Sequence, residues 1–228
     1  MLPLAGPAER VPFNRIRVRA AVALVASKHT AAHAHVIARA DYTALDEARR
    51  DRRLTYLPFV ARAVVVALHE YPSLNATTDG ETVLGHSEVH LGIAVDLDHE
   101  GLVVPVVRDA QNRTVGGLAA TISDLAARAR AKRLEPDDLA GGTFTITNPG
   151  GYGTHWSFPI INRPQVAILS TDGVRKRVVA DALTATPRIA LVGHLGLGYD
   201  ARAVDPADAA RFVQRVGELI ASSDWTIQ

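Results

Sequence analysis

The sequence predicts one α/β or α+β domain built on a mixed sheet with flanking helices. Its 228 residues are 47% hydrophobic and 21% charged, the balance of an ordinary globular protein. Segments of helical period alternate with strand-like segments, and a block of strand candidates lies between two groups of helices. This order is typical of helices packed on a sheet with both parallel and antiparallel strands.

Composition excludes several functional classes. The formal net charge is +1, so electrostatics give no reason to expect nucleic acid or a membrane as partner. The chain has no cysteine, which rules out disulfides, thiolate metal sites and cysteine nucleophiles. No apolar run reaches the roughly 18 residues of a membrane span, and no signal pattern opens the chain. We therefore expect a cytoplasmic protein.

The chain opens with an aperiodic segment. Residues 1–10 hold two prolines and a glycine, and we interpret them as a flexible lead-in to one domain over residues 11–228. Ile16 to Ala31 has helical period, with arginines on its first turns. Positive charge is unfavourable at a helix N-terminus. These arginines are expected either to meet a carboxylate elsewhere or to form a solvated basic face.

A strand and two helices follow. His33 to Tyr42 alternates like a half-buried strand, and Ala44 to Arg52 is helical. Phe59 to His69 is strongly apolar, which predicts a buried core helix. Pro72 ends it, and residues 72–76 are expected to form a loop.

Three strand candidates occupy the middle of the chain. Glu81 to Leu84 is short, Val89 to Leu97 alternates, and Leu102 to Arg108 is nearly continuously apolar. Pro105 lies inside the third run, and proline cannot donate to a sheet ladder. That strand is therefore expected at an edge or a bulge.

Two helices then lead to a strand that ends in a glycine-rich turn. The helices are Val115 to Arg133 and Pro136 to Ala140, and the strand breaks at Asn148. Three threonines share one face of this strand: Thr143, Thr145 and Thr147. Threonines are common strand formers, yet one at a strand end beside such a turn can present its hydroxyl to a ligand.

The C-terminal part predicts three strands and a helix. The strands are Gln165 to Leu169, Arg175 to Val179 and Ile189 to Tyr199, and the helix is Ala207 to Ser222. The turn between the last two elements holds one arginine and three aspartates but no nucleophile and no base: Arg202, Asp200, Asp205 and Asp208.

The nine histidines suggest no clear metal site. His33 and His35 share one face of a strand, so they are either metal ligands or ordinary strand residues. His194 lies within the last strand and is expected to pack with backbone partners. His155 follows the glycine-rich turn and either faces a ligand or lies at the surface.

Taken together, these segments resemble the catalytic core of dihydrolipoyl acyltransferases, the central components of 2-oxoacid dehydrogenase complexes. The resemblance runs from about Val11 to the C-terminal helix. It rests on motifs in chain order: Arg17 with Ser27-Lys28, Leu57-Pro-Phe, Pro72-Ser-Leu-Asn, Gly101-Leu-Val-Val-Pro-Val-Val, Gly142-Thr-Phe-Thr-Ile-Thr-Asn, Pro159-Ile-Ile-Asn-Arg-Pro-Gln-Val-Ala-Ile-Leu, and Tyr199-Asp with Arg202, Asp205 and Ala209-Ala-Arg-Phe.

The resemblance implies a chloramphenicol-acetyltransferase-like fold and a homotrimer with active sites between subunits, assembled into a 24- or 60-subunit core. It implies transfer of an acyl group from dihydrolipoyl-lysine to coenzyme A, without a metal. The lipoyl group would come from a domain that this chain does not contain, and the other partners would be the decarboxylase and dihydrolipoamide dehydrogenase components.

The resemblance also assigns residues. Thr147 matches the hydroxyl that stabilises the oxyanion, and Asp205 matches an aspartate that supports the active-site turn by pairing with an N-terminal arginine, here Arg17. Arg202 belongs to the same turn. Asn148 and His155 are candidates for the substrate channel.

At one position the chain departs from the family pattern. The family's general-base histidine is replaced by Ala201, and the glycine that closes the same motif is replaced by Pro206. Alanine accepts no proton, and a general base contributes about 10²–10⁴-fold in rate. Proline fixes φ near −65°, so the turn is expected to differ in shape.

Three functions remain open from the sequence. The first is an acyltransferase core impaired by Ala201. The second is a non-catalytic scaffold that binds partner subunits or coenzyme A. The third is a coenzyme A-dependent acyltransferase of another pathway, because a fold does not fix a reaction.

Overall fold

The computed structural model describes residues 10–98, 100–181, 184–222 and 225. Apart from Arg10, the expected lead-in at residues 1–10 lies outside the described residues.

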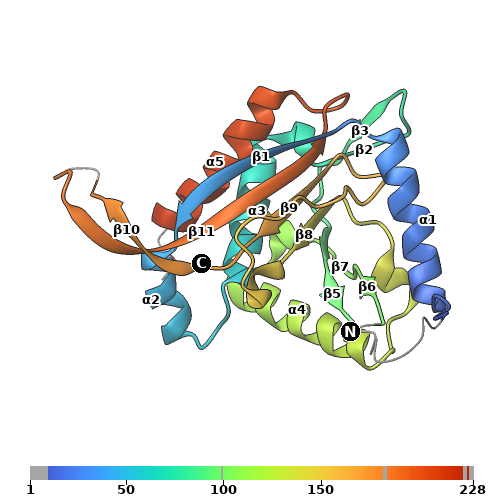
Figure 1. Ribbon diagram of the computed structural model, residues 1–228, viewed down its shortest axis with the longest axis horizontal. Coiled ribbons are helices and arrows are strands. Elements are labelled where there is room, and N and C mark those ends of the chain that lie inside the picture. The colour runs from blue at the N-terminus through green and yellow to red at the C-terminus, as the bar shows by residue number, and fades with distance from the viewer. Residues whose placement is uncertain (1–9, 99, 182–183, 223–224, 226–228) are drawn as a thin grey trace.

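A seven-stranded mixed sheet forms the centre of the domain (Figure 1). Its order is β1-β11-β9-β8-β4-β7, with β10 paired to β11. β4, β8 and β9 run parallel to one another, and the other pairs are antiparallel. The strands are β1 (His33–Asp41), β4 (Leu91–Ile93), β7 (Val106–Val107), β8 (Phe144–Thr147), β9 (Ala167–Thr171), β10 (Arg175–Ala180) and β11 (Pro187–Asp200).

Two short hairpins stand beside the main sheet. β2 (Ala76–Thr78) pairs with β3 (Val83–Gly85), and β5 (Val95–Asp96) pairs with β6 (Leu102–Val103). The second hairpin lies near the N-terminal end of the first helix, where the Asn14 side chain donates to the Glu100 carbonyl at 2.7 Å.

In the part of the chain that the structure describes, five α-helices pack around this framework. Figure 1 shows their arrangement. α3 is buried along nearly its whole length and packs against α4 and α5, as its apolar sequence predicts. α5 covers β1. The helices are α1 (Arg15–Thr30), α2 (Thr43–Asp51), α3 (Leu57–Glu70), α4 (Val115–Arg130) and α5 (Pro206–Ser222).

The core lies between the sheet and α3, α4 and α5. Its largest fully buried side chains include Tyr42, Phe59, Phe144 and Phe212. Phe212 of α5 contacts Phe144 of β8, with ring centroids 5.7 Å apart. The helix α5 is thereby fixed to the strand that carries Thr147.

The middle of the chain is more broken than the sequence predicts. The run Val89 to Leu97 is two strands, β4 and β5, because the chain leaves the main sheet after Ile93. The Ala94 N–H still donates to the Ile146 carbonyl of β8 at 3.0 Å, but Val95 and Asp96 pair with β6. The run Leu102 to Arg108 is interrupted at Pro105, which has no N–H to donate. Its second half, β7, lies at the sheet edge, as Pro105 predicts.

Residues 72–76 are also more ordered than a loop. They form a 3-10 turn, η1 (Pro72–Leu74), and the start of β2. The buried Asn75 side chain stabilises this arrangement, because its Nδ2 donates to the carbonyls of His86 and Glu88 at 2.8 and 2.9 Å.

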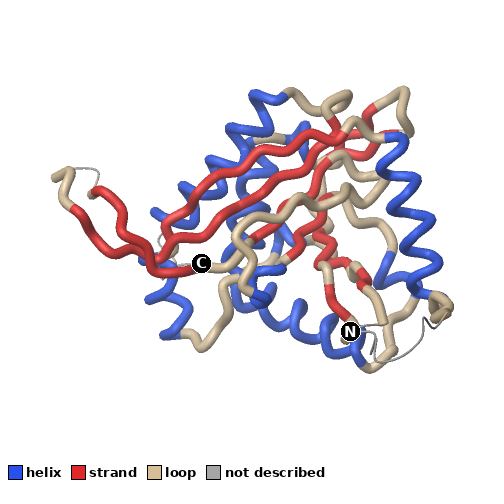
Figure 2. Tube along the Cα trace, viewed as in Figure 1, coloured by secondary structure: helices blue, strands red, loops and turns tan. Residues whose placement is uncertain are grey.

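β11 is longer than the sequence predicts and extends beyond the body of the domain. With β10 it forms a ribbon that projects from one side of the molecule (Figure 2). Val178 and Ile189 face each other across this ribbon and are 74% and 69% exposed.

Candidate active site

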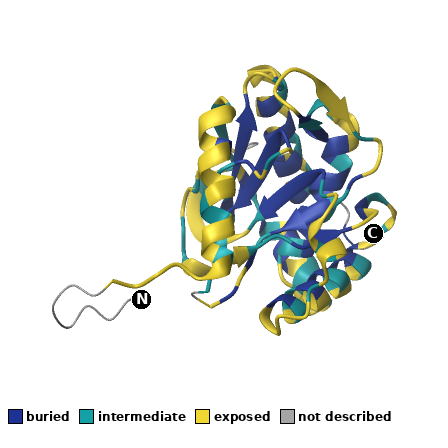
Figure 3. Cartoon of the chain, turned by 90° about the vertical axis from the view of Figure 1, so that its right-hand side faces the viewer, coloured by how far each residue is buried: buried dark blue, intermediate teal, exposed yellow. Residues whose placement is uncertain are grey.

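An open cleft of about 540 Å³ lies under α1. The inner face of α1 carries small side chains there, Ala23 and Ala26, which do not fill the space between helix and sheet. The opposite walls are the end of β8 and the loop of residues 157–163. α1 is exposed over most of its length (Figure 3), and Ser27 is its buried residue.

Thr147 is the threonine whose hydroxyl is available in this cleft. Thr143 Oγ1 accepts from the His90 N–H at 3.0 Å, and Thr145 Oγ1 donates to Gln165 Oε1 at 2.6 Å. Among the described residues, no hydrogen-bond partner is found for the Thr147 hydroxyl, and Thr147 lines the cleft. The Thr147 hydroxyl is therefore free to donate to a bound group. The sequence pattern alone could not distinguish Thr147 from Thr143 and Thr145 in this respect.

The glycine-rich turn after β8 is a 3-10 turn, η4 (Pro149–Tyr152). Asn148 caps it, and its Oδ1 accepts from the Gly150 N–H at 3.2 Å. His155 follows the turn at the surface, where its Nδ1 lies 3.4 Å from Arg177 Nη2 of β10. Asn148 thus shapes the turn beside the cleft, while His155 faces the ribbon.

The outer wall of the cleft rests on glycines of β11. A Cβ at Gly196 would lie 2.8 Å from the Ser157 carbonyl oxygen, and one at Gly198 would lie 2.9 Å from the Pro159 carbonyl oxygen. The loop backbone therefore touches the strand where only glycine leaves room. His35 of β1 adds a hydrogen bond from Nε2 to the same Pro159 oxygen at 3.2 Å.

The two strand histidines are used in the protein framework. His33 Nδ1 donates to the Ala31 carbonyl at 3.2 Å, and its Nε2 accepts from the Ile161 N–H at 3.1 Å. Burial lowers the pKa of His33, so the neutral form is favoured. With both ring nitrogens engaged, His33 has no lone pair for a metal, which argues against the His33–His35 metal hypothesis.

His194 packs edge to face against Trp156, with ring centroids 6.0 Å apart. Burial lowers its pKa.

The turn after β11 is held by a buried carboxylate. Asp200 is 1% exposed, and its Oδ1 accepts from the Ala32 N–H at 3.2 Å. Arg202 donates to both carboxylate oxygens, with Nη2 2.7 Å from Oδ2. Burial alone would raise the pKa of Asp200, but the hydrogen bonds from Arg202 and Ala32 outweigh it and lower that pKa. The Ala201 N–H donates to the Ala32 carbonyl at 2.9 Å, and the Ala201 side chain is exposed.

Asp205 and Arg17 lie at opposite ends of α1. Asp205 is exposed at the start of α5, where its carbonyl accepts from the Ala209 N–H at 3.0 Å. Arg17 is near the N-terminal end of α1 and lines a hollow beside Asp96. At a rise of 1.5 Å per residue, Arg17 lies about 20 Å along the helix from Thr30. Thr30 is the end of the helix that lies next to the turn with Ala201. Pairing between Arg17 and Asp205 would therefore need a second copy.

Thr147 and Ala201 are also far apart within one chain. Thr147 pairs with Ser170 of β9, and Ser170 pairs with Gly196 of β11. Ala201 comes after Gly196 by about five strand steps, or about 17 Å, and two strand spacings add about 10 Å across the sheet. The two positions are thus about 20 Å apart, too far to act on one reacting atom.

Sequence reasoning missed a buried polar cluster beside Thr147. Asp172, just after β9, is 3% exposed. Its Oδ1 accepts from Thr154 Oγ1 at 2.6 Å and from Ser157 Oγ at 2.7 Å, and its Oδ2 accepts from Ser170 Oγ at 3.3 Å. Ser157 also lines the cleft. The available signal was an acidic residue directly after a buried strand.

One group of the described residues has the composition of a metal site. Ligand atoms of Glu88, His90 and Asp109 lie within 4.8 Å of one another, and both carboxylates are exposed. His90 Nδ1 accepts from the Asp109 N–H at 3.1 Å, so Nε2 carries the ring proton. Metal-bound histidines instead donate their second nitrogen. The cluster is therefore best described as a surface hydrogen-bonded group.

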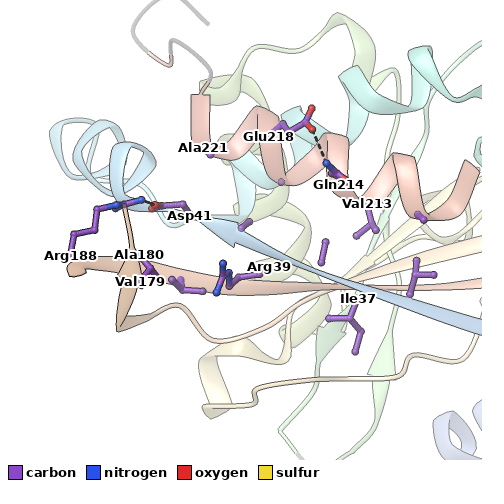
Figure 4. A pocket seen from close by; sticks show the side chains of 16 residues that line it. Ile37, Arg39, Asp41, Val179, Ala180, Arg188, Val213, Gln214, Glu218 and Ala221 are labelled. Carbon is purple, nitrogen blue, oxygen red and sulfur yellow. Dashed lines mark hydrogen bonds and ion pairs between the residues drawn. The ribbon is translucent and has the colours of Figure 1, made fainter. Parts of the chain in front are cut away.

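A larger hollow of about 630 Å³ lies between α5, β1 and the β10–β11 ribbon (Figure 4). Four of its polar side chains form two pairs. Arg188 pairs with Asp41 at 2.5 Å, and Gln214 donates to Glu218 at 3.3 Å. The hollow offers no free reactive group comparable to Thr147.

None of the described helices is both long and apolar enough for a membrane crossing.

The comparison with protein families gives one match. The model for "2-oxoacid dehydrogenases acyltransferase (catalytic domain)" matches residues 5–226. Among curated relatives, the acetyltransferase component of the Corynebacterium glutamicum pyruvate dehydrogenase complex is 37% identical over 97% of this chain and 34% of its own length. The Escherichia coli K12 succinyltransferase component of the 2-oxoglutarate dehydrogenase complex is 35% identical over 93% of this chain and 54% of its own. The chain thus spans about a third to a half of these relatives.

Solved structures agree with the family match. The Azotobacter vinelandii dihydrolipoamide acetyltransferase, studied for the catalytic role of a serine, a histidine and an asparagine, superposes with a TM-score of 0.91 at 33% identity. The superposition covers 98% of this chain and 95% of the Azotobacter chain. The cubic core of a pyruvate dehydrogenase complex gives the same TM-score and identity. That superposition covers 98% of this chain and 96% of the cubic-core chain. A chloramphenicol acetyltransferase, at 13% identity and a TM-score of 0.56, shares the fold, as the sequence predicts.

Proposed function

The chain belongs to the 2-oxoacid dehydrogenase acyltransferase family, and we propose that it transfers an acyl group from dihydrolipoyl-lysine to coenzyme A at a site shared by two copies. The observation that carries this proposal is the Thr147 hydroxyl, which lines the cleft without a protein partner at the end of β8. A free hydroxyl at that place fits the task of stabilising a developing oxyanion.

The proposed reaction passes through a tetrahedral intermediate. The coenzyme A sulfur attacks the thioester carbon, and the carbonyl oxygen becomes an oxyanion that accepts a hydrogen bond from Thr147. Collapse of this intermediate expels the dihydrolipoyl sulfur. A thiol with a pKa near 8.5 is only about one to three per cent ionised at neutral pH, so a group that accepts its proton accelerates the attack.

Ala201 stands at the position expected for that group. The relative from Azotobacter vinelandii was studied for a histidine and an asparagine four residues apart, the spacing of Ala201 and Asp205 here. Because alanine accepts no proton, we propose that transfer is slower than in a chain with histidine at this position. The expected deficit is about 10²-fold or more.

The proposed assembly is a homotrimer. Thr147 lies about 20 Å from Ala201 within one chain, and Arg17 lies about as far from the turn that holds Asp205. Both pairs can meet only across an interface between copies. Similarity to a cubic core supports further assembly into a 24- or 60-subunit particle. A lipoyl domain, the decarboxylase and dihydrolipoamide dehydrogenase are the proposed partners.

The alternative is a non-catalytic scaffold core, and the exposed methyl group of Ala201 favours it. A coenzyme A-dependent acyltransferase of another pathway remains a third proposal, to be tested by product analysis with a panel of acyl-coenzyme A donors.

The test is transfer from acetyl- and succinyl-dihydrolipoamide to coenzyme A. Thr147→Val removes the hydroxyl at constant volume, and Thr147→Ser retains it as the matched control. We expect Thr147→Val to lower kcat by about 10²–10³-fold, the effect of losing one oxyanion donor, and Thr147→Ser to stay within about threefold. Equal rates for the two variants would contradict the assignment of Thr147.

Ala201→His tests the missing base. We expect kcat to rise at least about tenfold at neutral pH. A smaller gain would mean that the missing histidine does not limit transfer. No transfer by either chain, together with a trimeric or larger particle in light scattering, would favour the scaffold.

A further inference from the structure

Asp172 is a buried carboxylate without a neighbouring ion pair among the described residues. It is 3% exposed, yet its side-chain partners among the described residues are three hydroxyl groups and no cation. Burying a carboxylate in this way is costly unless hydrogen bonds satisfy it, so each hydroxyl must direct its proton at Asp172.

One of these hydroxyls belongs to the wall of the cleft. Ser157 lines the same cleft as Thr147, and its Oγ lies 2.7 Å from Asp172 Oδ1. An ionised carboxylate only accepts hydrogen bonds, so the Ser157 proton is committed to Asp172. Toward the cleft, Ser157 therefore presents lone pairs alone and can accept a proton or a hydrogen bond from a bound ligand.

The cluster is rigidly connected to Thr147. Thr147 lies beside Ser170 in the parallel β8–β9 pair, and Ser170 donates to Asp172 Oδ2 at 3.3 Å. The turn after Thr147 packs on the backbone of Asp172, since a Cβ at Gly150 would lie 2.8 Å from the Asp172 carbonyl carbon. The oxyanion donor and the carboxylate are thus held by the same ends of two adjacent strands.

Resting on the acyl transfer proposed above, we propose that Ser157 and Asp172 form a proton relay that accepts the coenzyme A thiol proton. As the sulfur attacks the thioester, the S–H bond breaks and its proton moves to Ser157 Oγ, while the Ser157 proton moves to Asp172 Oδ1. When the intermediate collapses, the departing dihydrolipoyl sulfur takes a proton from Ser157, which recovers its own from Asp172. No proton is gained or lost overall.

The relay explains how transfer proceeds without a base at Ala201. A carboxylate is a weaker base than an imidazole, so the relay supports slower transfer than a histidine would. The expected gain from Ala201→His is therefore compatible with it.

The test compares Ser157→Ala and Asp172→Asn with a matched control, Thr154→Val. Thr154 donates to the same carboxylate oxygen at 2.6 Å, but it is not among the residues that line the cleft. Asparagine keeps an oxygen for Thr154 and Ser157 and presents its Nδ2 to Ser170, whose hydroxyl can accept, but it cannot take up the proton. At pH 6.5 we expect kcat to fall at least about tenfold in Ser157→Ala and Asp172→Asn, and less than about threefold in Thr154→Val.

The pH dependence separates the relay from a purely structural role. Above the thiol pKa of about 8.5 coenzyme A needs no base, so the deficit at pH 9.5 should shrink at least about fivefold. Burial raises the pKa of the neighbouring Tyr42 to about 12, so Tyr42 stays neutral over this range, and burial lowers the pKa of His194, which favours its neutral form.

Three outcomes would overturn the relay: a deficit that is equal at both pH values, a loss below threefold in Ser157→Ala, or an equal loss in Thr154→Val. If the unmodified chain transfers nothing but Ala201→His does, the relay fails and the proposed function stands. If both chains are inactive, both proposals fail.

Discussion

A close steric contact of the cleft wall predicts the effect of a single methyl group. Gly198 of β11 touches the loop that carries Pro159, and a Cβ added to Gly198 would lie 2.9 Å from the Pro159 carbonyl oxygen and 3.3 Å from His35 Nε2. Ordinary contacts begin near 3.4 Å, so the loop would have to move by about 0.5 Å. The carbonyl cannot move freely, because it also accepts from His35 at 3.2 Å.

Overpacking of this kind costs about 1–3 kcal/mol. For a domain of this size, a loss of about 2 kcal/mol lowers Tm by roughly 4–8 °C. We expect Gly198→Ala to show this fall in a thermal scan at fixed protein concentration, and to lower transfer activity because the cleft wall shifts. Gly85→Ala is the matched control, since nothing lies within 4 Å of its added Cβ. A Tm for Gly198→Ala equal to that of Gly85→Ala would refute this account of the cleft wall.

Two further predictions concern stability. Gly217→Ala should raise Tm by about 1–4 °C, because its Cβ would make an ordinary 3.6 Å contact with Ala40 and alanine favours a helix over glycine by about 0.5–1 kcal/mol. Asp200→Asn should destabilise the domain at neutral pH but not in acid. The pKa of Asp200 is lowered in the fold, so its contribution is present above the unfolded pKa of about 3.9 and is lost as pH falls through the folded pKa. Urea midpoints of both chains measured from pH 7 to pH 3 should converge, and a constant difference would contradict this reasoning.

Long periodic segments allowed most of the architecture to be predicted. α3 is buried along nearly its whole length, and β1 and β11 pair over nine residues, as their patterns indicate. The strand block around Pro105 could not be resolved in the same way. Its breaks depend on which strand each backbone group pairs with, such as Val95 with Val103 of β6, and hydropathy does not encode those choices.

The site was only partly predictable. The resemblance to a family pointed to Thr147, but its availability follows from the partners of Thr143 and Thr145, which appear only in the fold. Ser157 and Asp172 are about fifteen residues apart in sequence and meet because the loop after β8 folds back over the end of β9. No spacing rule predicts such a contact, since it depends on the path of a loop.

A mixing experiment tests most directly whether two copies share the site. Chains with Ala201→His and Thr147→Val have the introduced histidine but no oxyanion donor, and the unmodified chain has the donor but no histidine. Mixed trimers, formed by joint refolding and verified by mass, should contain sites that combine both groups. We predict at pH 6.5 a rate at least about fivefold above the sum of the two separate chains, because a restored base adds tenfold or more at each such site. A mixture no faster than that sum would contradict a site shared between copies.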